Sequence, residues 1–134
     1  MFLCTKTTDR FKLVFQGDPA VEEEGESWIP LDQATILKGQ SADVFVCRPL
    51  NSDECFRIIQ ATQKDQTFIS FAAMLGVVEI QTDGRKLEKP EEIHPILENA
   101  QNMGPILSLA AVIFQVSREG LDTINFRDPR PSME

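Results

Sequence analysis

Histidine and cysteine, which carry much of the chemistry of enzymes and metal sites, are scarce in this sequence. It has one histidine, His94, and three cysteines, Cys4, Cys47 and Cys55, with no Cys-x-x-Cys pair among them. The glycine-rich phosphate-binding motifs and the His-Glu-x-x-His metal motif are also missing. We therefore expect no metal ion, no cofactor and three reduced thiols without a joint role.

Basic residues are also few. The chain has 13 Lys and Arg against 21 Asp and Glu, which gives a net charge of −8. Because nucleic-acid phosphates are gripped by Lys and Arg, this balance argues against a nucleic-acid partner. The densest acidic cluster, at residues 22–26, could collect a divalent ion, but we favour a solvated acidic loop.

Long apolar runs are missing as well. The longest are residues 71–78, interrupted by Gly76, and residues 109–114. A helix that spans a bilayer needs about 20 apolar residues. The N-terminus shows no charged stretch followed by a long apolar run, so no secretory signal is visible. We expect no membrane partner and a cytoplasmic protein.

What is present suffices for one modest core, because 42% of the 134 residues are hydrophobic. We expect a single α+β domain over residues 1–121, in which a small antiparallel β-element precedes a mainly helical part. The β-rich part should cover residues 1–50 and the helical part residues 51–121. Residues 122–134 hold two prolines and few apolar side chains, which predicts a flexible tail.

Alternating apolar residues predict the β-element. Residues 10–16 place Phe11, Leu13 and Phe15 on one face, and residues 42–48 are rich in β-branched and aromatic residues. We expect these two strands to pair in an antiparallel manner. A further short strand should begin at Trp28 and end at Pro30.

Capping residues and apolar periodicity predict the helices. Asn51 and Glu54 form a capping-box pattern for a helix to about residue 63, with an apolar stripe of Cys55, Phe56, Ile58 and Ile59. Asp65 should begin a second helix that Gly76 ends. Asp83-Gly84 predicts a turn, Pro90 a third helix and Pro105 a fourth that runs to residue 118 and is apolar almost all round.

The two most apolar helices can be interpreted in two ways. As core, the residues to expect are Phe68, Phe71, Leu109, Ile113 and Phe114. As a groove for an amphipathic partner helix, the contact residues to expect are Phe68, Ile69 and Met74, with Ile106 second. Both interpretations stay open, because a chain of this size needs most of its apolar residues for its own core.

A small enzyme is a further alternative, with His94 as its base and one of the cysteines as a nucleophile. Nothing in the local sequence singles out one of the three. Ser70, Ser108 and Ser117 sit in helical patterns and not in a Gly-x-Ser-x-Gly turn. We therefore expect no catalytic residues.

The order of segments over residues 42–121 resembles the tail assembly chaperones of long-tailed bacteriophages. In that family an extended segment runs through an Arg-Pro-Leu type of step into a polar helix start. An apolar helix, a strand ending in an Asp-Gly turn, an acidic helix and a last apolar helix follow. The pieces that match are Val44 to Leu50, Asn51 to Glu54, Val77 to Ile80, Thr82 to Leu87, Pro90 to Ile93 and Leu107 to Leu121.

The resemblance implies a non-catalytic assembly factor of a phage or prophage. Such proteins coat the tape measure protein in the infected cell, keep it soluble and help tail tube subunits to polymerise around it. The partners to expect are therefore a tape measure protein and a tail tube protein, in the cytoplasm of the host bacterium. A homo-oligomer stays open, and so does a different role as a structural virion component, such as a neck or tail-completion protein.

Overall fold

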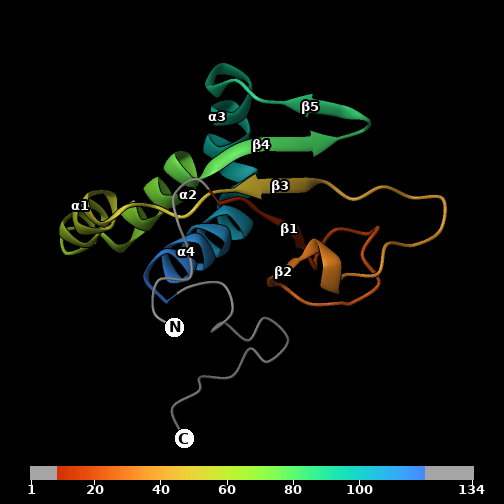
Figure 1. The fold of residues 1–134 in the computed structure, drawn as a ribbon, viewed down its shortest axis with the longest axis horizontal. Helices are drawn as coiled ribbons and strands as arrows, with labels where there is room; N and C mark the ends of the chain where they lie inside the picture. The colour runs from red at the N-terminus through yellow and green to blue at the C-terminus, as the bar shows by residue number, and fades with distance from the viewer. Residues whose placement is uncertain (1–8, 120–134) are drawn as a thin grey trace, which may run out of the picture.

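Helices cover one face of a five-stranded antiparallel sheet in the computed structural model, which describes residues 9–119 (Figure 1). The strand order is β2-β1-β3-β4-β5. The strands are β1 (Phe11–Phe15), β2 (Trp28–Pro30), β3 (Val44–Cys47), β4 (Val77–Thr82) and β5 (Arg85–Leu87). The α-helices are α1 (Ser52–Thr62), α2 (Phe71–Gly76), α3 (Pro90–Glu98) and α4 (Met103–Glu119). Short 3-10 turns are η1 (Leu31–Gln33), η2 (Gln66–Ser70) and η3 (Ala100–Asn102). The fold is α+β, as expected from the sequence.

The predicted strand pair is confirmed. Strands β1 and β3 run antiparallel, with Leu13 opposite Phe45, and β2 pairs with the other edge of β1 and ends at Pro30. The mainly helical part after residue 50 also returns two strands to the sheet. They form a hairpin because Asp83 and Gly84 both take positive φ, 49° and 76°, which suits a tight two-residue turn.

Caps fix where the helices begin. The Asn51 side chain accepts a hydrogen bond from the Glu54 N–H at 2.8 Å, and the Glu54 carboxylate accepts one from the Asn51 N–H at 2.9 Å. This is the capping box that the sequence predicted. Asp65 caps η2 through the Thr67 N–H, and Pro90 starts α3. No helix among residues 9–119 is both long and apolar enough to cross a bilayer.

The main core lies between the sheet and helix α4. Leu109 and Ile113 are fully buried there, as predicted, and Phe114 is partly buried at its edge. Helix α2 packs closely on α4 at Gly76. A Cβ at this glycine would lie 2.7 Å from Ile113 Cγ2, so a larger residue would push the two helices apart.

A smaller core lies on the opposite face of the sheet. Val14 and Val44 project from neighbouring strands and meet Ile29 and Val21. The chain between β1 and β3 closes over them, so this end of the sheet is covered on both faces. The tail predicted for residues 122–134 lies outside the described residues.

The step from β3 into α1 ties three elements together. Arg48 donates two hydrogen bonds to the Glu54 carboxylate, at 3.0 and 2.8 Å. The Leu50 N–H donates to Ser117 Oγ on α4 at 2.7 Å. The hydrogen bonds from Arg48, with a further one from Asn51, lower the pKa of Glu54. The Arg-Pro-Leu step is therefore a fixed joint between the sheet, α1 and α4.

Candidate protein-binding site

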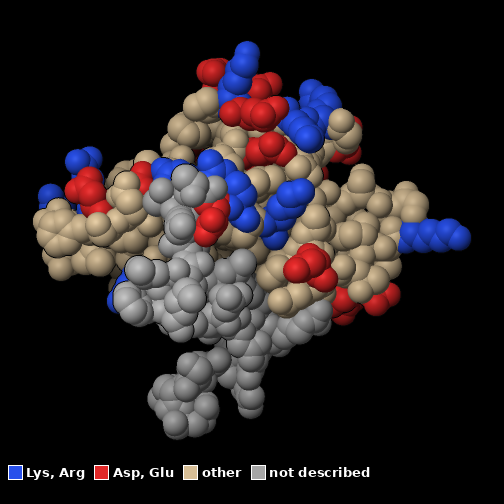
Figure 2. Space-filling view, in the orientation of Figure 1, with Lys and Arg blue, Asp and Glu red and all other residues tan. Residues whose placement is uncertain are grey.

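The helical side of the molecule exposes large apolar side chains. The large apolar residues that are exposed among residues 9–118 are Phe56, Ile59, Phe68, Phe71, Leu75 and Met103. We call these six residues the exposed apolar set. Charged side chains of both signs gather around α3 and β5, at the top of Figure 2, and others lie over α1, at its left. Helix α1 therefore carries exposed apolar residues and the exposed ion pair of Arg57 with Asp53 together.

Packing of small residues turns part of this set outward. On α2 the side facing α4 consists of Ala72, Ala73 and Gly76, which are all buried. The large residue Phe71 then falls on the outer side of α2, 46% exposed, and Phe68 on the preceding η2 is 36% exposed. The prediction that these two phenylalanines belong to the core is therefore wrong, because the close contact with α4 leaves room for small side chains alone.

Helix α1 shows the same division. Cys55 and Ile58 are buried, whereas Phe56 and Ile59 face outward, with Phe56 57% exposed. The predicted apolar stripe joined both pairs. It was too broad, because an 11-residue helix that packs on one side buries a narrow row of positions.

A groove of about 390 Å³ lies between η2, α2, the end of α3 and the start of α4. We call it the helix groove. Its apolar lining consists of Phe68, Phe71, Met74, Leu97, Met103, Ile106 and Leu107. The rings of Phe68 and Phe71 stack with centroids 5.4 Å apart and planes 7° apart, so they form one flat wall. Thr67, Ser70, Glu98 and Asn99 supply polar groups to its lining.

Three of the four residues predicted to contact a partner line this groove. Phe68 lies in the exposed wall, Met74 is partly buried, and Ile106 is buried. Ile69 instead packs against the core and does not line the groove. The structure thus brings Phe68, Met74 and Ile106 together and leaves Ile69 aside.

Sequence reasoning missed Met103 and Leu97. Met103 was placed before the helix, whereas α4 begins at Met103 itself and carries that side chain to the groove. Its spacing of three residues from Ile106 was the available sign, because residues three apart share a helix face. Leu97 comes from α3, and the packing of α3 against α4 is tertiary structure that a local sequence pattern cannot predict.

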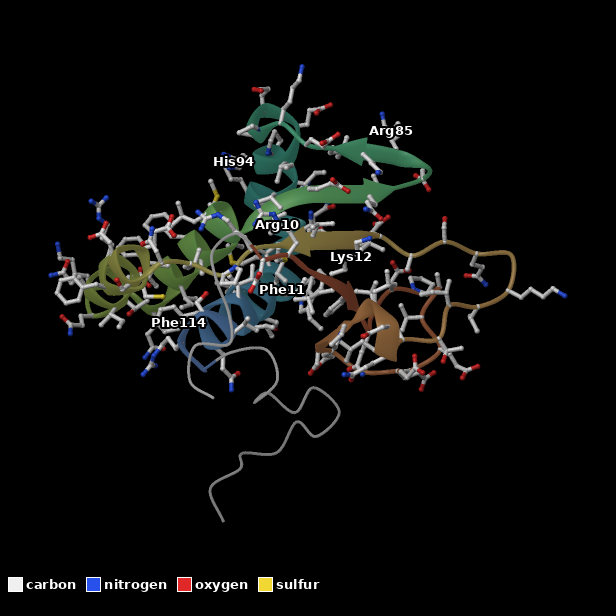
Figure 3. The ribbon with its side chains drawn as sticks, viewed as in Figure 1. Arg10, Phe11, Lys12, Arg85, His94 and Phe114 are labelled. Carbon is white, nitrogen blue, oxygen red and sulfur yellow. The ribbon has the colours of Figure 1, made fainter. Side chains whose placement is uncertain are left out.

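Of the residues considered for catalysis, Cys4 lies outside the described residues. His94, labelled in Figure 3, is partly buried on α3. Burial raises the pKa of the Cys47 thiol and of the Cys55 thiol, whereas a nucleophilic cysteine needs a lowered pKa. Within the described residues, no three His, Cys, Asp or Glu side chains are grouped to hold a metal ion.

The helix groove therefore has apolar walls and a polar margin. Grooves of this kind suit the apolar face of an amphipathic helix, whose side chains are spaced three and four residues apart. Comparison of this chain with protein-family models, with curated proteins and with solved structures finds no match.

Proposed function

We propose that this protein is a non-catalytic binding protein that shields an apolar helical segment of a client. The observation that carries the proposal is the helix groove with the stacked, exposed rings of Phe68 and Phe71. Exposed aromatic side chains cost free energy in water, since burying one fully contributes about 1.5–3 kcal/mol. A partner that covers this wall recovers that free energy.

The client class follows from the order of segments. The chain resembles tail assembly chaperones of long-tailed phages over residues 42–121, and the clients of that family are tape measure proteins. We therefore propose a tape measure protein as the client, in the cytoplasm of the host bacterium, with the tail tube protein as a further partner. The resemblance includes the Arg-Pro-Leu step, which here is the joint held by Arg48, Glu54 and Ser117.

The acidity of the chain supports this role. A net charge of −8 makes copies of the protein repel one another, so a client coated by several copies would stay dispersed. In this proposal the negative charge keeps the coated client dispersed, and the helix groove binds it. Binding should show a negative heat-capacity change, the mark of apolar burial, and weaken only mildly with added salt.

Co-expression with a candidate tape measure protein tests the proposal. The wild-type chain should keep the client in the soluble fraction, and the double variant Phe68→Ser with Phe71→Ser should let it sediment. Phe56→Ser is the matched control, because Phe56 is also exposed but lies outside the helix groove. Circular dichroism should show that both variants remain folded.

Two outcomes contradict the proposal. One is a client that is equally soluble alone or with the double variant. The other is the presence of the protein in purified virions at a fixed copy number, measured by mass spectrometry. The second outcome would assign the chain to the structural components of the particle, because an assembly chaperone leaves before completion.

A further inference from the structure

A second hollow, of about 300 Å³, lies between the β1–β2–β3 end of the sheet and the start of α4. We call it the Trp28 cavity. It shares Ile106 with the helix groove and is otherwise lined by different residues. No part of the proposed function uses it.

Three aromatic rings from three neighbouring strands build its wall. Phe15 on β1 lies opposite Trp28 on β2, with ring centroids 5.2 Å apart. Phe45 on β3 meets Trp28 edge-on, with centroids 5.0 Å apart and planes at 73°. Trp28 and Phe45 belong to the main core and are 3% and 8% exposed, whereas Phe15 at the edge of this cluster is partly buried.

The wall is held in position by its surroundings. Trp28 Nε1 donates a hydrogen bond to the Pro105 carbonyl at 2.8 Å, so the polar atom of the indole is already satisfied. The Phe15 ring lies against Gly17, where a Cβ would run into the ring. The cavity therefore presents aromatic carbon and not an indole N–H.

Two carboxylates and the Asn102 side chain are the polar side chains of the lining. Asp18 Oδ2 accepts a hydrogen bond from the Asp43 N–H at 3.0 Å, and Asp18 Oδ1 accepts one from the Ala20 N–H at 2.9 Å, which holds Asp18 beside Asp43. Asp43 Oδ1 accepts one from Thr82 Oγ1 at 2.6 Å. Neither carboxylate forms an ion pair with a Lys or Arg among residues 9–119. The cavity thus combines an aromatic wall with two negative charges that lack a cationic partner there.

We infer that the Trp28 cavity binds an arginine side chain of a partner protein. A guanidinium is planar, stacks on aromatic faces and is more weakly hydrated than an ammonium, so it suits a site that is part aromatic and part acidic. Asp18 and Asp43 supply the complementary charge. The inference does not depend on the helix groove, and either proposal can fail without the other.

The single tryptophan makes the test direct. Trp28 is the one Trp of the chain, so its indole N–H gives a single resonance in a proton–nitrogen correlation spectrum. Titration with acetyl-arginine methylamide should shift this resonance with saturation. Acetyl-citrulline methylamide has nearly the same shape without the charge, and it should leave the resonance in place.

A matched pair of variants tests whether the negative charge of Asp43 contributes to binding. Asp43→Asn keeps an oxygen for Thr82 and should weaken binding of the arginine compound by about two- to fivefold, as expected for a partly exposed charge pair. Asp83→Asn removes the same charge in the β4–β5 turn and should change nothing. Equal shifts with the citrulline compound, no saturable shift with the arginine compound, or equal binding by Asp43→Asn would overturn the inference.

Discussion

Helix α4 and the η2–α2 segment are both apolar and pack on each other, yet they place their large side chains differently. Helix α4 turns Leu109, Ile113 and Val116 into the core, where all three are fully buried. The η2–α2 segment turns its small residues inward and leaves Phe68 and Phe71 exposed. The difference shows that the distance between two helices, as well as hydrophobicity, decides which side chains are buried.

The sharpest way to break this comparison is to truncate one large side chain in each segment. Ile113→Ala should lower the free energy of unfolding by about 2–5 kcal/mol, because it leaves a cavity in the core. Phe71→Ala removes a larger side chain, but one that is 46% exposed, and should cost about 1 kcal/mol or less. Urea denaturation measures both values. Equal losses would mean that Phe71 belongs to the core after all.

The close contact at Gly76 gives the next largest effect. Gly76→Ala should destabilise the protein by about 1–3 kcal/mol, because the new methyl group would meet Ile113 Cγ2. Adding Ile113→Ala to this variant should cost less than the sum of the two single changes, since it removes the Cγ2 and Cδ1 atoms that the new methyl group would meet.

Gly104→Ala is the control for this substitution. A Cβ at Gly104 would meet nothing within 4 Å, and the residue lies in α4, so thermal unfolding should be unchanged or slightly raised. A Gly76→Ala variant as stable as this control would show that α2 and α4 can separate without cost. The explanation for the outward phenylalanines would then be wrong.

The smallest effect concerns the joint between the sheet and the helices. Because the folded-state pKa of Glu54 is lowered, its stabilisation is present above the ordinary glutamate pKa of about 4.3 and is lost as pH falls through the folded-state value. Glu54→Gln keeps the helix cap and removes the charge, which should cost about 1 kcal/mol or less near pH 7.

Thermal unfolding as a function of pH measures this loss. The gap in midpoint between the wild-type protein and Glu54→Gln should close toward acid pH, because the wild-type carboxylate then becomes protonated. Glu26→Gln, in an exposed loop, should give no comparable closing of the gap. A gap that is constant down to low pH would show that the Arg48–Glu54 pair contributes no charge-dependent stability.

Local features were predictable from the sequence because they depend on neighbouring residues. Asn51 and Glu54 specify a cap within four positions, and Asp83-Gly84 specifies a turn by the conformations that these two residues tolerate. The alternation in β1 also showed correctly that Phe11 and Leu13 share a buried face.

Features that join distant segments were not predictable. The outward position of Phe71 depends on how near α4 lies to α2, which no local pattern contains. The helix groove unites residues from η2 to α4, and the Trp28 cavity unites Phe15 with Ile106. Periodicity therefore identified the apolar residues correctly but could not tell which of them face the core and which are exposed.

The path of the chain between β3 and β4 has a consequence for evolution. These two strands are adjacent in the sheet, yet residues 48–76 leave it from one strand and return to the other, and this excursion carries five members of the exposed apolar set. Both ends of the excursion are anchored at neighbouring strands, and lengthening such a segment costs little loop-closure entropy. Selection can therefore lengthen this excursion or change its exposed residues while the order of the strands stays the same.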